Sequence, residues 1–199
     1  MELSATFLYA DLANSSKIAK AFDRRVAAKI IKSFLATTTR LIRFNSGTVV
    51  SFDGDRVLGI FTGNFKNSEA VKCGLQINYV VKEIIRPKFE ASYNNVKTAE
   101  FGINHGVGID TGTVLIVRAG ARGANDLISI GRAPNLAAKL SDIRESADHQ
   151  TYITASVYNM LAGYAKYANK TREDMWENRT WNFLGDNISI YRSSYYWPI

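Results

Sequence analysis

The chain has 199 residues, enough for one compact domain with an apolar core, and its single cysteine and two histidines argue against a disulfide or a structural zinc site. Its net charge of +7 favours polyanionic partners such as nucleotide phosphates or nucleic acid, although a solvated helix face explains the same charge. No segment reaches the roughly 18 to 20 apolar residues of a membrane span and no leader pattern opens the chain, so we expect a cytoplasmic protein without a membrane partner.

The N-terminal segments predict a strand followed by helices. Residues 3–12, LSATFLYADL, are rich in aromatic and β-branched residues and predict a buried strand that ends near Asp11. Asn14, Ser15 and Ser16 are candidate N-caps for a helix over residues 13–22. Apolar residues at helical spacing continue to Ile42, with a break near Asp23.

The middle of the chain predicts a hairpin, a helix and two more strands. Residues 48–63 contain two strand-forming runs that meet at Asp-Gly-Asp, where Gly54 suits a tight turn. Residues 67–89 predict a long helix that stops before Pro87. Residues 100–120 predict two strands that turn at Thr111 and Gly112.

The remaining segments complete an α+β pattern. We expect a short strand at residues 127–131, a helix at 133–146 with Pro134 in its first turn, and a strand with a short helix at 151–161. A closing hairpin follows within residues 179–199. The order of elements predicts one domain over residues 1–199, with helices on one face of a largely antiparallel sheet.

Two aspartates at predicted strand ends suggest a metal site. If the first strand lies beside the hairpin, as in β-α-β-β motifs, Asp11 and Asp55 meet at one end of the sheet. Two carboxylates placed there repel each other, and a divalent cation removes that penalty. A helix start directly after Asp11 offers N–H groups to a phosphate, so the segment is suited to phosphoryl transfer on two metal ions.

Four segments then indicate a family. FLYADLANSS, SFDGDRVLGIF, GVGIDTGTVL and SIGRAPNLAAKL occur in the order and spacing of the class III nucleotidyl cyclases, and the chain resembles this family over roughly residues 4 to 145. The resemblance implies a ferredoxin-like core and a homodimer with active sites at the subunit interface. It also implies two divalent ions, magnesium or manganese, held by Asp11, Asp55 and the backbone carbonyl of Leu12. A nucleotide 3′-oxygen would attack its own α-phosphorus and release pyrophosphate. Asp53 would be a turn residue, or it would support the metal ligands without contacting the metal.

The resemblance assigns further residues, with several departures. Asn135 matches the asparagine that orients the ribose, and Lys139 stands where the family usually has a phosphate-binding arginine. The two share a helix face, but lysine lacks the bidentate fork of arginine. The family's late phosphate-binding lysine has no clear match; Arg192 or a basic residue of the first long helix is a candidate replacement. Asn14 stands where the family often has glycine, and we assign the phosphate contact to residues Asn14, Ser15 and Ser16.

The base-reading positions lack both purine patterns. Ser51 stands where adenylate cyclases have lysine and guanylate cyclases glutamate, and Ile128 occupies the partner position. The compact form and this absence resemble the pyrimidine cyclases of bacterial anti-phage Pycsar systems, which make cyclic UMP or cyclic CMP for a separate effector. Uridylate cyclase is therefore the first prediction. Cytidylate or adenylate cyclase, a nucleotide-binding sensor and a nucleic-acid-binding domain that uses the basic first helix remain alternatives, and His105 is either a general base or a packed residue.

Overall fold

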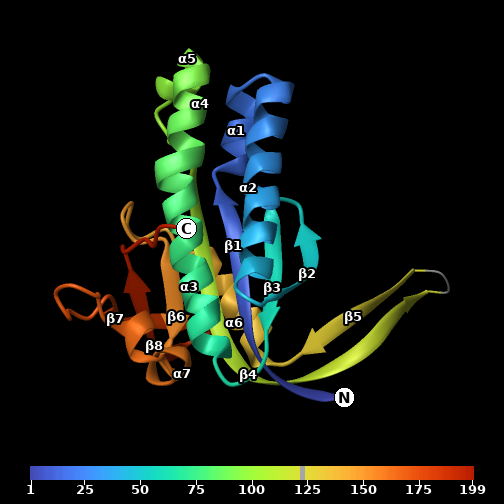
Figure 1. Ribbon diagram of the computed structural model, residues 1–199. Helices are drawn as coiled ribbons and strands as arrows, with labels where there is room; N and C mark the ends of the chain where they lie inside the picture. The colour runs from blue at the N-terminus through green and yellow to red at the C-terminus, as the bar shows by residue number, and fades with distance from the viewer. Residues whose placement is uncertain (122–123) are drawn as a thin grey trace.

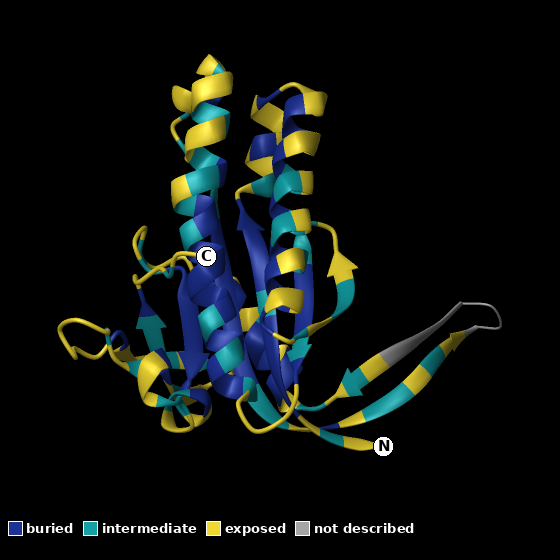
Figure 2. Ribbon diagram, in the orientation of Figure 1, coloured by how far each residue is buried: buried dark blue, intermediate teal, exposed yellow. Residues whose placement is uncertain are grey.

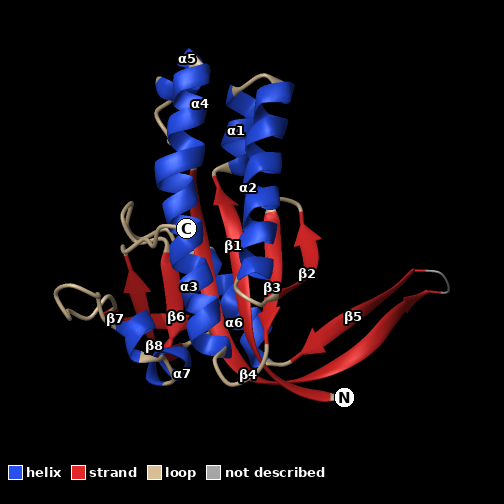
Figure 3. Cartoon of the chain, in the orientation of Figure 1, coloured by secondary structure: helices blue, strands red, loops and turns tan. Residues whose placement is uncertain are grey.

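A single mixed sheet organises the molecule (Figures 1 and 3). The computed structural model describes residues 1–121 and 124–199, and the side chains of residues 1–120 and 128–199. Within this part of the chain, eight strands form the sheet in the order β2-β3-β1-β4-β6-β8-β7, and β5 pairs with β4. All pairs are antiparallel except β4 with β6. The strands are β1 Glu2–Ala13, β2 Thr48–Asp53, β3 Arg56–Phe61, β4 Asn104–Ala121, β5 Ala124–Ile130, β6 Thr151–Thr154, β7 Glu177–Phe183 and β8 Asp186–Ser193.

The central strand β1 is buried on both faces, and its side chains divide the core in two. Leu8, Ala10 and Leu12 belong to the larger apolar cluster, whereas Ala5 and Phe7 belong to a second cluster on the other face. This alternation follows from the two-residue period of a strand. Figure 2 shows the buried centre of the sheet in dark blue between the helices.

Helices cover both faces of the sheet. α2 (Arg24–Phe44) and α3 (Lys66–Tyr79) pack on the face that carries Leu8, and α6 (Arg132–Ser141) packs on the face that carries Phe7. The α+β class with a largely antiparallel sheet is confirmed, but α6 departs from the expected single helical face. The other helices are α1 Ser15–Ala21, α4 Arg86–Ser92, α5 Asn94–Lys97, α7 Ala155–Asn159 and α8 Gly163–Lys166. None of the helices in the described residues is long and apolar enough to cross a membrane.

Glycines on β4 explain how α6 reaches the second face. A Cβ atom at Gly108 would lie 2.1 Å from the carbonyl oxygen of Ala137 and 2.4 Å from the amide nitrogen of Ser141. Only a residue without a side chain therefore lets the helix backbone lie this close to the strand. The glycine-rich GVGIDTG segment thus serves close helix packing.

Most of the helix and strand boundaries predicted from the sequence agree with the structure. The break at Asp23 is confirmed, because Asp23 caps α2 by accepting a hydrogen bond from the Arg25 amide at 2.8 Å. The β2-β3 hairpin is also confirmed, with Gly54 at φ 60°. Asn14 occupies the N-cap position of α1, but in a left-handed conformation and without a side-chain cap bond.

The predicted turn at Thr111 and Gly112 and the predicted helix end before Pro87 are wrong, and the helix predicted to reach residue 146 ends at Ser141. β4 is one continuous strand, because Thr111 and Gly112 pair with Thr6 and Ala5 of β1 in unbroken register instead of turning. The helix that was expected to stop before Pro87 continues through it into α4. A π-helical segment, Val80–Ile85, precedes α4, and its wider turn rearranges the hydrogen bonds where proline lacks an N–H.

Candidate active site

Asp11 lies near the end of β1 and is held by two arginines. It pairs in register with Arg56 of β3 and Gly106 of β4, and only 8% of its surface is exposed. The Arg56 Nε atom donates to Asp11 Oδ1 at 3.0 Å, and the Arg144 Nη2 atom donates to Asp11 Oδ2 at 2.7 Å. Both carboxylate oxygens are thus paired with cations in this structure.

The β2-β3 turn brings Asp55 to the same end of the sheet. The Leu12 amide donates to the carbonyl oxygen of Asp55 at 3.4 Å, which joins the turn to the end of β1. A cavity of about 370 Å³ opens there, and it contains all three predicted metal ligands. Its lining residues are Asp11, Leu12, Ala13, Asn14, Ser15, Ser16, Lys17, Asp55, Arg56, Asp142 and Arg144.

The electrostatics of Asp11 suit a cation. Burial raises the pKa of Asp11 to about 6, Arg56 opposes that rise, and Asp55 adds to it through like-charge repulsion. A buried carboxylate with a raised pKa gains free energy when a cation lies against it. The two aspartates and the cavity therefore fit a divalent metal ion.

The small number of carboxylates limits which metal fits. Among the side chains of residues 1–120 and 128–199, no group of three or more His, Cys, Asp or Glu could hold a metal ion by itself. Magnesium needs only one or two protein carboxylates when phosphates and water complete its shell. The site thus fits a metal that arrives with a phosphate ligand, and it does not fit a metal held by protein alone.

The predicted phosphate-binding residues line the same cavity. Asn14 has φ 61°, and Ser15 and Ser16 open α1 directly after β1. Their backbone therefore borders the space beside Asp11 and Asp55. The three residues lie where the sequence placed them, although their contact with a phosphate stays a prediction.

The predicted catalytic residues of α6 lie outside this cavity. α6 buries Leu136, Ala137 and Leu140 against the sheet, whereas Asn135 and Lys139 are exposed. The Asn135 side chain donates to the carbonyl oxygen of Gly131 at 3.3 Å. Within one chain, the two α6 residues are thus grouped with each other but do not line the space beside Asp11.

The two predicted base-binding residues lie on separate strands. Ser51 is half-buried on β2 and pairs with Leu58, whereas Ile128 is 46% exposed on β5 and pairs with Val117. In hydrogen-bonding order, β3, β1 and β4 lie between these strands. A common base pocket formed by the two residues remains a prediction.

Two basic residues of the site were missed by the sequence analysis. Arg56 and Arg144 line the cavity, whereas the suggested replacement Arg192 pairs with Glu177 on β7 through its Nε atom at 2.9 Å. Arg56 directly follows Asp55, so its nearness was visible in the sequence. Arg144 had no such signal, because it was assigned to the helix over residues 133–146, whereas α6 ends at Ser141.

Comparison with known proteins identifies the family. No family model matches the chain. It is 57% identical over 196 residues to the uridylate cyclase of Rhodovulum sp. (strain MB263), covering 98% of this chain and 81% of that protein. It is 43% identical over 197 residues to the uridylate cyclase of Xanthomonas perforans, covering 99% of this chain and 81% of that protein. The chain belongs to the uridylate cyclase family.

Solved structures place this uridylate cyclase family member in the class III cyclase fold. The guanylyl cyclase Cya2 superposes with a TM-score of 0.80 at 17% identity, over 98% of this chain and 94% of that one. The adenylyl cyclase CyaB from P. aeruginosa gives 0.79 at 18% identity, over 97% and 94%. The predicted class of protein and its fold are therefore confirmed.

Proposed function

We propose that this chain is a uridylate cyclase, which converts UTP to cyclic UMP and pyrophosphate as a second messenger in bacterial anti-phage defence. The observation that carries the proposal is the cavity lined by Asp11, Leu12 and Asp55 together with the predicted phosphate-binding residues Asn14, Ser15 and Ser16. Family membership supports it, because the relatives at 57% and 43% identity are named uridylate cyclase.

The residues of the cavity and two residues of α6 would have separate roles in the reaction. Asp11, Asp55 and the backbone carbonyl of Leu12 would hold two divalent ions, magnesium or manganese. Bound there, such ions would activate the attacking 3′-oxygen and neutralise the charge of the phosphates. The first turn of α1 would orient the triphosphate. Asn135 would orient the ribose, and Lys139 would supply a positive charge to the phosphates without the bidentate contact of arginine.

A homodimer completes this arrangement. Asn135 and Lys139 are exposed and do not line the cavity of their own chain, so a second copy would place them opposite Asp11 and Asp55. Exposed apolar residues support such an interface, and three of them lie on the β4-β5 arm that projects from the body in Figure 1. They are Leu115, Ile128 and Ile130 on this arm, and Phe52 beside the exposed face of α2.

The preference for a pyrimidine rests on the two base-reading positions. Ser51 and Ile128 cannot reproduce the pair of polar side chains that reads a purine, and a site without those hydrogen-bonding groups recognises that purine weakly. Replacement of Ser51 by lysine together with Ile128 by threonine is expected to shift the substrate preference toward ATP. An unchanged substrate profile would mean that other residues read the base.

The nucleic-acid alternative would use aromatic residues such as Phe34 and Tyr9 with the basic helix, and it is weakened because Phe34 is buried and Tyr9 packs partly buried against the core. Phe34 is 1% exposed and belongs to the core, so it is not available to stack on bases. The basic residues of α2 remain exposed, and steep salt-dependent binding of oligonucleotides without nucleotide turnover would favour that alternative. The cytoplasmic location and the separate downstream effector stay predictions attached to the cyclase proposal.

The deciding experiment is incubation of the purified protein with equal amounts of ATP, GTP, CTP and UTP, with magnesium and then manganese. Mass spectrometry of the products is expected to show cyclic UMP. Cyclic CMP or cyclic AMP would keep the reaction and change the base assignment. The absence of any cyclic product, in a preparation whose fold is verified by circular dichroism, would contradict the proposal.

A further inference from the structure

Gly106 on β4 makes room for the guanidinium of Arg144. A Cβ atom at this position would lie 2.3 Å from Arg144 Nη1 and 2.3 Å from the carbonyl oxygen of Ser141. Real side chains do not approach this closely, so any other residue would displace the arginine. The space above Gly106 is therefore filled by Arg144, at the position in register with Asp11.

Arg144 is fixed in this space by backbone and carboxylate contacts. Nη1 donates to the carbonyl oxygens of Ser141 at 2.5 Å and of Ile143 at 2.9 Å, and Nη2 donates to Asp11 Oδ2 at 2.7 Å. A guanidinium carries five N–H donors, so these bonds leave it with donor capacity. Its side chain is 35% exposed and borders the cavity, so this capacity is open to a ligand.

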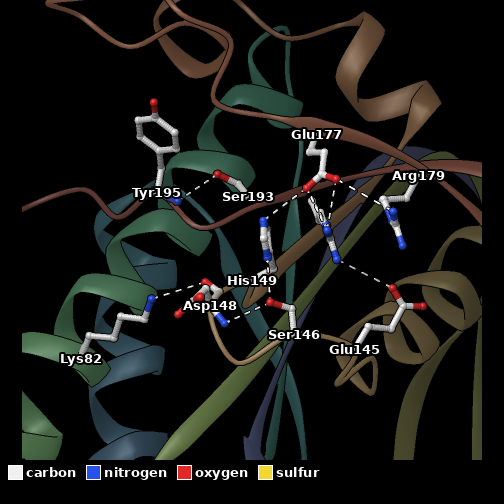
Figure 4. Close-up of polar contacts among 10 residues, drawn as sticks. Lys82, Glu145, Ser146, Asp148, His149, Glu177, Arg179, Ser193 and Tyr195 are labelled. Carbon is white, nitrogen blue, oxygen red and sulfur yellow. Dashed lines mark hydrogen bonds and ion pairs between the residues drawn. The ribbon is translucent and has the colours of Figure 1, made fainter.

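The segment that carries Arg144 is also anchored on its other side (Figure 4). The Arg192 Nη1 atom lies 4.0 Å from a carboxylate oxygen of Glu145, and His149 Nε2 lies 3.5 Å from Glu177 Oε2. The His149 Nδ1 atom is 3.0 Å from the hydroxyl oxygen of Ser146. These contacts tie residues 145–149 to the β7-β8 hairpin and so hold the backbone next to Arg144 in place.

The two arginines that pair with Asp11 differ in the carboxylate partners that they would keep if a metal ion bound Asp11. Arg56 also pairs with Asp142, at 2.8 Å between Nη2 and Oδ1. Within the described residues, Asp11 is the only carboxylate that pairs with Arg144. A cation on Asp11 would therefore leave Arg56 with a counter-charge and Arg144 without one.

The charge of the cavity lining indicates which ligand would replace Asp11 as the partner of Arg144. Three carboxylates, Asp11, Asp55 and Asp142, face three cationic side chains, Lys17, Arg56 and Arg144, so the lining is close to neutral. Divalent ions would make it strongly positive, and a polyphosphate restores the balance. Planar guanidinium donors match phosphate oxygens well.

We propose that Arg144 is a phosphate-binding residue of this cavity, which contacts the triphosphate of the substrate and the pyrophosphate product, and that Gly106 exists to admit it. The proposal rests on the proposed function for the identity of the substrate. Arg144 would pair with Asp11 when no metal is present and turn to the phosphate when metal and phosphate enter together. It would thereby supply a cation that the sequence analysis could not place.

Calorimetric titration of pyrophosphate in the presence of magnesium tests this role. Arg144→Gln is expected to weaken pyrophosphate binding by about 10- to 100-fold, the range for loss of a charged hydrogen-bonding group. Arg144→Lys keeps the charge but loses the fork, and we expect a loss of about 3- to 10-fold. Arg179→Gln removes an exposed arginine outside the cavity and should bind within about twofold of the wild type.

A second measurement separates phosphate binding from simple neutralisation of Asp11. Without pyrophosphate, manganese binding followed by electron paramagnetic resonance should be tighter in Arg144→Gln, because Arg144 competes with the cation for Asp11. Tighter manganese binding with unchanged pyrophosphate affinity would overturn the proposal, as would a wild type that binds no pyrophosphate with magnesium. If Arg144→Gln does not fold, unchanged affinity in Arg144→Lys overturns it alone.

The outcomes also separate this inference from the proposed function. A wild type that cyclises UTP while its Arg144 variants bind pyrophosphate normally would contradict only the role of Arg144. A wild type that makes no cyclic nucleotide but binds pyrophosphate through Arg144 would contradict only the cyclase assignment.

Discussion

Asp11 and His105 are neighbouring buried ionisable residues on opposite faces of one sheet. Leu12 pairs with His105 across β1 and β4, and Asp11 pairs with Gly106 in the next position. Asp11 is 8% exposed and His105 is 1% exposed. Burial raises the pKa of Asp11 to about 6 and lowers the pKa of His105 to about 3, so it opposes the charged form of both.

The environments of Asp11 and His105 are different. Asp11 borders the cavity and has a guanidinium on each carboxylate oxygen. His105 faces α2, its ring centroid lies 6.4 Å from that of Phe34, and neither ring nitrogen has a hydrogen-bond partner within the described residues. A perturbed pKa therefore does not identify the site. Access to a cavity and the presence of countercharges identify the site. His105 has neither within the described part of the chain, so we interpret it as a packed residue and not as a general base.

The strongest test of this distinction is replacement of each residue. Asp11→Asn keeps the size of the side chain and removes the charge that would bind metal, so turnover is expected to fall at least about 1,000-fold, as for loss of a central electrostatic group. His105→Leu should keep at least about half of the wild-type activity per folded molecule. Both are measured by the cyclic nucleotide assay.

Thermal unfolding and size-exclusion chromatography serve as controls for these two variants. Asp11→Asn should remain folded and keep the oligomeric state of the wild type, because Arg56 and Arg144 are each about one-third exposed and can be hydrated. Full activity in Asp11→Asn would remove it from the site. A loss in His105→Leu as large as that in Asp11→Asn would instead restore His105 as a member of the machinery.

A second test compares two glycines of β4. Gly106→Ala would force a Cβ to 2.3 Å from Arg144 Nη1 and from the Ser141 carbonyl oxygen, whereas the nearest atom to a Cβ at Gly112 is the Ala133 Cβ at 3.5 Å. Overpacking of this kind costs about 1–3 kcal/mol in free energy of unfolding. We expect that loss for Gly106→Ala, together with weaker pyrophosphate binding, and little change for Gly112→Ala.

Chemical denaturation of the two alanine variants measures the difference. If Gly106→Ala is as stable as Gly112→Ala, the strand and α6 are less tightly packed than the distances indicate. If Gly106→Ala is destabilised but binds pyrophosphate normally, the glycine serves helix packing alone and Arg144 does not need the space above it.

The sequence was sufficient for the fold where local signals agree with long-range pairing. The β2-β3 hairpin has a turn glycine between two apolar runs, and α2 has a capping aspartate. It was insufficient for β4, because the apparent turn at Thr111 and Gly112 is overridden by continuous pairing with β1, which no local residue encodes. The helix end predicted before Pro87 is also wrong, because the π-helical segment Val80–Ile85 rearranges the hydrogen bonds before the proline and the helix continues into α4.

The site was predictable in so far as it lies close to identifiable motifs. Asp11 and Asp55 could be joined because a β-α-β-β arrangement brings the strand end and the hairpin turn together. The contact of Arg144 with Asp11 could not be predicted, because the two residues are 133 positions apart in the sequence. The contact depends on where α6 ends and on the absence of a side chain at Gly106. Contacts made by a long side chain from a loop need the folded backbone before they can be inferred.

The smallest expected effect concerns the pH dependence of stability. The pKa of His105 is lowered in the folded protein, so the unfolded chain binds a proton more readily below pH 6.5 and acid favours unfolding. Asp11 acts in the opposite direction, because its pKa is raised in the fold, so its contribution to stability falls as the pH rises from about 4 to 6.

Comparison of the wild type with His105→Leu isolates the contribution of His105 to the pH dependence of stability, because both proteins contain Asp11. Between pH 7 and pH 5 the variant should gain about 2 kcal/mol in free energy of unfolding relative to the wild type, measured by urea denaturation at both values. A constant difference would mean that the imidazole is protonated or solvated inside the fold, and the contrast between the two faces of the sheet would then rest on the cavity alone.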